Sequence, residues 1–311
     1  MKNKINDVVA LSNLLARKTN NLKDIELKKL FFIALASVPD FHEKLDNDTI
    51  IINKKEMFDR LGIDEQKGDT YKRYRSLFQK LIRSTYYDFG NDKEFESGYM
   101  FYDVSARGNS YKIKVNKKFL PALAELKKNY TKFLTDDLMQ FKSAHSASLY
   151  QFLMSMSNRK EVDFTTKQLK ETFGLSKDDY CYKNGKFDRK NFEIKTIETA
   201  LEEIDAKCKS IVIFKQLNEK GQTQLYRKTY KKNKDGKETR FVDRYIIRFQ
   251  VTDPNIVLNQ QTQIQTTINE FLEDQERPRS NFKRAIYGRN QKLESFRIQQ
   301  INKNLYNWLE E

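Results

Sequence analysis

The sequence is poor in the residues that disulfide frameworks, metal clusters and membrane spans require. Its 311 residues include two cysteines, two histidines, one tryptophan and four prolines. Cys181 and Cys208 cannot build a disulfide framework, so we expect a protein of the reducing cytoplasm. No stretch approaches 18 uncharged apolar residues, which predicts that the chain does not span a membrane. Residues 1–7 also lack the apolar core of a signal peptide.

The shortage of histidine limits the chemistry as well. His42 and His145 are too few for a zinc site, a Ser-His-Asp triad or a histidine-dependent nuclease, and His145 lies on an apolar stripe typical of a core. Neither a Walker-type G-x-x-x-x-G-K-[ST] loop nor a G-x-G-x-x-G motif occurs. No pair of carboxylates stands out from the helix-surface background. We therefore predict a protein that is not an enzyme, with no catalytic residues, no metal site and no cofactor.

Positive charge is abundant and unevenly distributed. The chain has 58 Lys and Arg against 43 Asp and Glu, a formal net charge of +15. Three windows, 71–83, 181–240 and 277–292, hold all of the surplus, and the rest of the chain is slightly acidic. Solvated lysine-rich helix faces would explain one such window. Three of them favour a protein that binds nucleic acid.

Part of the sequence occurs twice. Residues 52–63 and 164–175 share one pattern at a constant offset of 112 positions. Each copy has a short apolar strand end, a polar helix start at Asn53 or Thr165, a two-turn helix and a closing glycine. A glycine there suits the left-handed cap that a Cβ atom would oppose. The pattern predicts one helix pair present in two copies.

The helix that follows each copy carries four apolar residues with the same spacing. The two quartets are Tyr74, Leu77, Phe78 and Leu81, and Ile197, Ala200, Leu201 and Ile204. Their offset is 123 positions, so the second copy contains an insertion of about eleven residues between the helices. Strand-like segments follow at 98–104 and 111–115 in the first copy, and at 211–214, 224–227 and 245–251 in the second, with a hairpin break at 234–237.

Helix, strand, helix, turn, helix and β-hairpin is the order of a winged helix. The fold class predicted is therefore α+β, with two tandem winged-helix DNA-binding domains and a C-terminal helical tail. We place the N-terminal domain at 1–130, the C-terminal domain at 131–253, and a polar linker with a basic tail at 254–311. The alternative, two α+β domains that merely share a helix pair, explains less of the matched order, spacing and charge.

A helix-turn-helix places its second helix in the major groove, with its N-terminal residues at the base edges. Arginine can pair with guanine and glutamine with adenine, while other basic residues hold phosphates. Glu193 and Glu198 lie nearby and would accept from cytosine or repel misplaced phosphate. The predicted DNA-binding residues are Lys72, Arg73, Arg75, Gln79, Lys80 and Arg83 in the first copy, and Lys186, Arg189, Lys190, Asn191, Lys195, Arg227, Lys228, Lys231 and Lys232 in the second.

Several segments resemble the iteron-binding plasmid replication initiators. Residues 9–16 and 22–30 look like the first two helices of that family, residues 148–153 like the helix that opens its second domain, and residues 200–205 like the end of its second recognition helix. The similarity covers about residues 5–252. The insertion at 176–189, the long charged wing at 218–244 and the tail depart from the family pattern.

The resemblance implies two winged-helix domains around a pseudo-twofold axis that bind directly repeated origin sequences. The second domain would make the main specific contact, and the first would add DNA contacts and form the dimer of a self-repressing form. Host initiator and replicative helicase are the implied further partners. A winged-helix transcription regulator without a replication role is the alternative, and a nicking or recombining enzyme is a third, less favoured one.

Overall fold

The computed structural model describes residues 6–12, 16, 22–40, 45–65, 68–90, 95–123, 126, 130–217, 221–233 and 237–259. Residues up to Val257 form one compact unit. The basic window at 277–292 and nearly all of the predicted tail lie outside the described residues, as does His42. Within the described ranges, no helix is long and apolar enough to cross a membrane.

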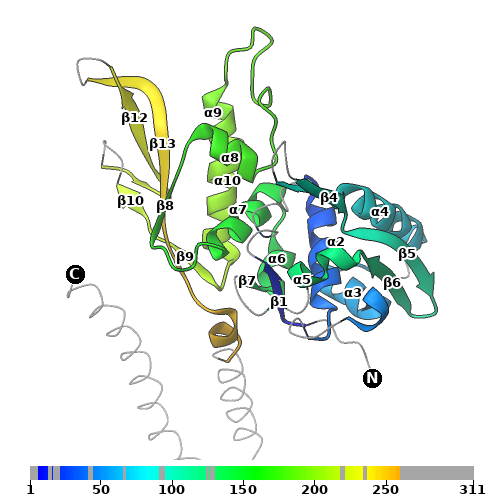
Figure 1. Ribbon diagram of the computed structural model, residues 1–311. Helices are drawn as coiled ribbons and strands as arrows, with labels where there is room; N and C mark the ends of the chain where they lie inside the picture. Colours follow the sequence, from blue (N-terminus) through cyan, green and yellow to red (C-terminus); the bar gives the residue numbers. More distant parts are fainter. Residues whose placement is uncertain are drawn as a thin grey trace, which may run out of the picture. The chain divides into compact units, whose positions relative to one another are not determined.

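Helix α2 (Ile25–Ala36) lies at the centre of this unit (Figure 1). Asp24 caps it by accepting a hydrogen bond from the Glu26 amide at 2.9 Å. The helix is apolar nearly all round, and nine of its twelve residues are buried, which is typical of a helix enclosed by others. Its helical neighbours are α4 (Thr70–Ser84), α6 (Thr135–Gln140) and α7 (Ala144–Met154).

The first motif, residues 25–115, continues from α2 into a small sheet and two helices. The elements are β2 (Thr49–Asn53), α3 (Lys54–Leu61), α4 (Thr70–Ser84), β5 (Phe101–Arg107) and β6 (Ser110–Val115). The strands pair in the order β2-β6-β5, all antiparallel. The predicted quartet of α4 is buried in the core of this motif, with each residue at most 8% exposed.

The second motif, residues 144–251, has the same order of elements. It consists of α7 (Ala144–Met154), β8 (Glu161–Phe164), α8 (Thr166–Thr172), a long helix over residues 189–207, β9 (Ile211–Ile213), β12 (Arg227–Lys232) and β13 (Glu238–Val251). Strand β13 pairs with β12, β8 and β9. The second predicted quartet is fully buried, and α10 (Thr199–Lys207), the end of the long helix, packs against α7.

The helix caps confirm the internal repeat. Asn53 accepts from the Glu56 amide at 3.1 Å, and Thr165 forms a reciprocal capping box with Gln168. Gly62 and Gly174 close the two helices with φ of +66° and +67°. Both ends of the repeated helix are therefore built from the residues that the pattern predicts.

Three segments differ from the sequence-based expectation. Residues 9–16 resemble a helix, but β1 (Val8–Ser12) is a strand that pairs with β7 (Tyr130–Leu134). Val9, Ala10 and Leu11 are all buried there, because β7 on one side and α2 on the other cover the strand. The local pattern could not reveal a partner so distant in sequence.

The other two differences concern strands. The strand expected at 224–227 is replaced by a short pair, β10 (Gln216–Leu217) with β11 (Thr223–Gln224), and β12 begins at Arg227. A hairpin of β3 (Tyr86–Gly90) and β4 (Phe95–Tyr99) precedes β5, so the segment predicted at 98–104 belongs to two strands. Short helices also cover Asp46–Asp48, Lys117–Phe119, α5 (Leu120–Leu123) and residues 254–259, at the start of the predicted linker.

A buried carboxylate joins α6 to the second motif. Asp137 accepts from the Ser210 hydroxyl at 2.6 Å, and from the backbone amides of Ser210 and Lys209 at 3.1 and 3.0 Å. The Cys208 thiol lies 3.2 Å away, and burial raises its pKa. The buried Asp137 carboxylate therefore has hydrogen-bond partners from the second motif, as buried polar groups require. The raised pKa keeps the Cys208 thiol protonated and unreactive.

Candidate nucleic-acid interface

Helix α4 presents a basic face opposite its buried quartet. The six residues predicted to contact DNA on this helix, Lys72, Arg73, Arg75, Gln79, Lys80 and Arg83, are all exposed. Two of them are engaged with the start of α2, where Arg73 pairs with Glu26 and Lys80 Nζ lies 3.2 Å from Asp24 Oδ2. The other four form no side-chain hydrogen bond or ion pair with the described part of the chain, so they are available to a ligand.

The helix over residues 189–207 begins at a built cap. The Asp188 carboxylate accepts from the backbone amide of Asn191 at 3.2 Å and from its side-chain amide at 2.6 Å. The hydrogen bond from the Asn191 side chain is the main reason that the pKa of Asp188 is lowered. Arg189, Lys190 and Lys195 are exposed in the first two turns. This is the end that a helix-turn-helix places in the major groove.

The middle of this helix is a π-helical segment. It separates α9 (Arg189–Phe192) from α10 (Thr199–Lys207) and covers Glu193–Glu198. The Thr199 amide reaches the Ile194 carbonyl, and the buried Thr196 hydroxyl donates to the Phe192 carbonyl at 2.5 Å. Segments of this kind occur often at functional sites. Glu193, the first residue of the segment, is buried.

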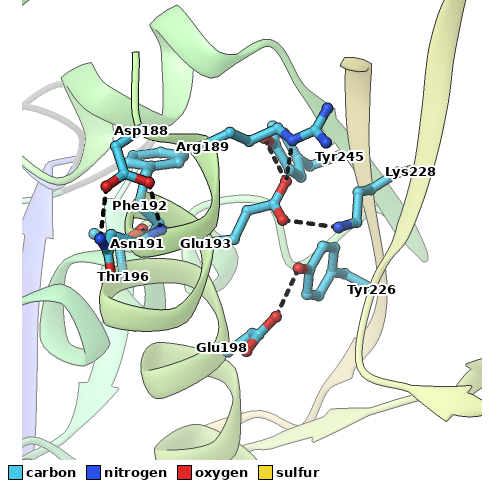
Figure 2. Close-up of polar contacts among 10 residues, drawn as sticks. All are labelled: Asp188, Arg189, Asn191, Phe192, Glu193, Thr196, Glu198, Tyr226, Lys228 and Tyr245. Carbon is cyan, nitrogen blue, oxygen red and sulfur yellow. Dashed lines mark hydrogen bonds and ion pairs between the residues drawn. The ribbon is translucent and has the colours of Figure 1, made fainter. Parts of the chain in front are cut away.

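Glu193 connects this helix to the β12–β13 hairpin (Figure 2). Its side chain is 8% exposed. Tyr245 Oη donates to Oε1 at 3.0 Å, Lys228 Nζ lies 2.8 Å from Oε2, and Arg189 Nε lies 3.7 Å from Oε1. Tyr226 Oη donates to Glu198 at 3.1 Å beside it. Burial raises the pKa of both tyrosines, so they remain hydrogen-bond donors at neutral pH.

These contacts change the interpretation of three predicted residues. Glu193 is buried among its own partners, so it neither accepts from cytosine nor repels phosphate. Lys228 is half-buried and turned toward Glu193, which makes it part of the scaffold. Arg189 contacts Glu193 and is still 42% exposed, so it can serve both the scaffold and a ligand.

The outer surface of the hairpin, which we call the wing (residues 227–251), is basic. Arg227, Lys231 and Lys232 are exposed on β12, and their side chains form no hydrogen bond or ion pair with the described residues. Lys186 is exposed in the loop before α9. The structure therefore places the predicted residues of the second motif in the loop before α9, in the first two turns of the long helix and on the wing. Figure 2 shows Lys228 turned toward Glu193.

Sequence reasoning missed two of the residues that organise this surface and gave a third, Glu193, a different role. Tyr226 and Tyr245 differ in no visible way from ordinary strand residues, because their roles depend on contacts between distant segments. Asp188 had a local signal, since aspartate is among the residues preferred at the N-cap of a helix. Among the described residues, no group of three or more histidine, cysteine or acidic side chains could hold a metal ion.

Comparisons with known proteins show what the sequence and the fold of this chain resemble. Residues 8–154 match the family model described as the WH1 domain of the initiator replication proteins. The fold is similar to that of the Pi initiator protein, solved in complex with iteron DNA, at 15% identity and a TM-score of 0.57, over 80% of this chain and 99% of that one. Domains 2 and 3 of RctB align over 75% of this chain and 82% of theirs, at 13% identity and a TM-score of 0.37, too low to indicate a shared fold. No curated protein sequence is detectably similar to the chain. The matched residues contain the whole first motif and helix α7 of the second, so this part of the chain is similar to the WH1 domain of the initiator replication proteins.

Proposed function

We propose that the protein initiates plasmid replication by binding directly repeated sequences, the iterons, at the origin. One observation carries the proposal: the same helix-strand-helix-helix-sheet order occurs twice, and in each copy the last helix exposes basic residues opposite a buried apolar quartet. The resemblance to the Pi initiator, whose structure contains iteron DNA, supports the same ligand.

In this proposal each motif is a winged helix, and the two are related by a pseudo-twofold axis. The C-terminal domain, residues 131–253, makes the main specific contact through Arg189, Lys190, Asn191 and Lys195. The N-terminal domain, residues 1–130, adds contacts through α4. Two such helices on one chain would read major-groove faces about 10 base pairs apart.

The test is footprinting of the full chain on the DNA that flanks its gene. We expect protection of several evenly spaced direct repeats, with an affinity that falls steeply with salt because phosphate contacts release counterions. One isolated inverted repeat would instead favour a winged-helix transcription regulator. No protection at any salt concentration would refute both functions.

Later steps of initiation complete the proposal. The bound protein promotes opening of the origin, with the host initiator and the replicative helicase as partners in the cytoplasm, and a dimer represses the protein's own gene. Permanganate reactivity of an adjacent AT-rich segment measures the opening. Sedimentation with and without operator DNA measures the monomer–dimer equilibrium.

We propose no enzymatic step. A supercoiled plasmid that carries the origin, incubated with the protein and Mg²⁺, should remain intact. Reproducible nicking that a Tyr→Phe substitution abolishes would assign the protein to the DNA-processing enzymes instead.

A further inference from the structure

The insertion between α8 and α9 is a small hairpin with defined hydrogen bonds. Cys181 and Phe187 form an antiparallel bridge. At the tip, the Tyr182 amide donates to the Lys186 carbonyl, and the Gly185 amide donates to the Tyr182 carbonyl, both at 2.8 Å. Gly185 adopts φ +76°, which favours glycine in the turn. We call residues 181–187 the loop hairpin.

A buried lysine anchors the base of the loop hairpin. Lys170 is 9% exposed, and its ammonium group donates to the carbonyls of Lys177 and Asp179 at 2.8 and 2.6 Å. It also lies over the Phe187 ring, 4.7 Å from the centroid. A buried cation with these three partners is satisfied only while the loop keeps this conformation.

The internal repeat shows that this lysine belongs to the insertion. The equivalent position in the first motif is Phe58, which packs edge-on against Tyr71 and Tyr74. The second motif replaces that apolar residue with Lys170 where about eleven residues are inserted. The cation and the loop that it binds therefore occur together in one copy and are both absent from the other.

The loop hairpin is held directly against α9. Phe187 and Tyr180 pack on Phe192, with ring centroids 5.4 and 5.7 Å apart, and the Asp188 amide donates to the Tyr180 carbonyl at 2.7 Å. The wing contacts the same helix through Glu193, on the side away from Asp188 and Asn191 (Figure 2). Figure 1 shows the loop extending beyond the start of α9, with the wing across the helix from it.

The tip of the loop hairpin is basic. Lys183 and Lys186 are exposed, and their side chains form no hydrogen bond or ion pair with the described residues. Residues 182–186 contain these two lysines and no acidic residue, so the tip itself carries positive charge. Asp179, which accepts from the Ser176 amide at 2.6 Å, and Asp188, which caps α9, lie outside the tip.

We propose that the loop hairpin is a second wing, which binds the sugar–phosphate backbone of duplex DNA beside the segment read by α9. The inference rests on the proposed function, since it extends the DNA contact of the same helix. Two basic hairpins, one on each side of α9, would hold the backbone at both edges of the groove. Lys170 is the positioning residue that holds the second wing in its conformation.

The experiment uses the full chain and a duplex that the wild-type protein selects from a random-sequence library. The test variant is K183A/K186A, and the control is K142A/K209A, which removes the same charge from exposed lysines near the far end of α10. We expect the test variant to lower the slope of log Kd against log salt by about 2, because each lost phosphate contact removes about 0.9. Hydroxyl-radical protection at one edge of the footprint should disappear with it, and the control should retain both.

The variant K170M separates anchoring from charge. It should lose hydrogen-exchange protection at the amides of Tyr182 and Gly185, and it should reproduce the smaller salt slope with both tip lysines present. An unchanged slope and footprint for K183A/K186A would overturn the second wing and leave the proposed function intact. If the wild-type protein selects no duplex, the proposed function itself fails, and the second wing fails with it.

Discussion

At the scale of single residues, the candidate interface contains two kinds of lysine. Some stabilise the fold through buried contacts, and others are exposed to solvent. Lys228 and Lys231 lie three positions apart on β12, but Lys228 is half-buried against Glu193 and Lys231 is exposed. Composition and charge counting treat them alike. The difference becomes visible only when the partner of each ammonium group is known.

Substitution of Lys228 should therefore reduce stability before it reduces DNA affinity. Lys228→Met leaves the Glu193 carboxylate buried with fewer partners, and we expect the free energy of unfolding to fall by about 1–3 kcal/mol. Lys231→Ala should leave stability unchanged and lower the salt slope of DNA binding by about 0.9. Urea unfolding and fluorescence anisotropy measure the two effects, and equal stability of both variants would contradict the assignment.

Two basic residues at the start of α9 destabilise the free helix and favour an anionic ligand there. Arg189 and Lys190 occupy the first turn, where the positive end of the helix dipole disfavours cations by about 0.3–1 kcal/mol each. Asp188 and Glu193 offset part of this repulsion. Basic residues at this end destabilise the free helix, and they gain when phosphate oxygens approach it.

At the scale of secondary-structure elements, the repeated helices test how much a cap contributes. Gly62 adopts φ +66°, and a Cβ atom added there would have no neighbour within 4 Å, so an alanine would be strained by its backbone alone. Gly62→Ala should cost about 1 kcal/mol of unfolding free energy. Gly68→Ala is the matched control, since open space surrounds it without a positive φ. Thermal unfolding that ranks the two variants equally would contradict the cap.

The π-helical segment predicts a second difference between matched variants. Thr196 and Thr199 each donate a hydroxyl hydrogen bond to a carbonyl of the preceding turn, at 2.5 and 2.8 Å, but Thr196 is buried and Thr199 is exposed. Thr196→Val should lower the free energy of unfolding by about 1–2 kcal/mol, because the buried Phe192 carbonyl loses a donor that water cannot replace. Thr199→Val should change it by less than about 0.5 kcal/mol. Urea unfolding of both variants provides the comparison.

Local signals predicted the elements of this fold better than its contacts. Asn53, Thr165 and the two cap glycines act within a few residues of their own positions, so the repeat revealed them. The strand at Val8–Ser12 and the burial of Glu193 depend on partners far along the chain, and no local pattern encodes those partners. The exposed basic residues of α4 and α9 followed from helical spacing, while the roles of Lys170 and Lys228 did not.

At the scale of the whole molecule, buried ionisable groups determine how stability depends on pH. Burial lowers the pKa of Lys28 from 10.5 to about 7. Between these values the unfolded chain binds more protons than the folded one, so stability rises with pH across this window. Burial raises the pKa of Tyr74 and Tyr111 to about 12, and their contribution is present below pH 10 and lost above it.

We therefore expect maximum stability near pH 9–10, with a gain of about 2 kcal/mol between pH 7 and pH 9 from Lys28. Lys28→Met should remove this gain and stabilise the protein at pH 7. Lys55→Met, on an exposed part of α3, should leave the pH profile unchanged. Urea unfolding at pH 7 and pH 9 decides between these outcomes, and a persistent rise in Lys28→Met would refute the role of Lys28.

The pairing of β1 with β7 has a consequence for synthesis on the ribosome. Val8 and its strand partner Leu134 are 126 residues apart in the chain. During translation β1 must wait without its sheet partner until β7 has left the exit tunnel, several seconds later at about 5–20 residues per second. Stalled nascent chains should gain protease resistance in the N-terminal region when β7 emerges, well after α4 and β6 are outside. Completion of this region is thus timed by its last strand, when the chain has already begun to make the second motif.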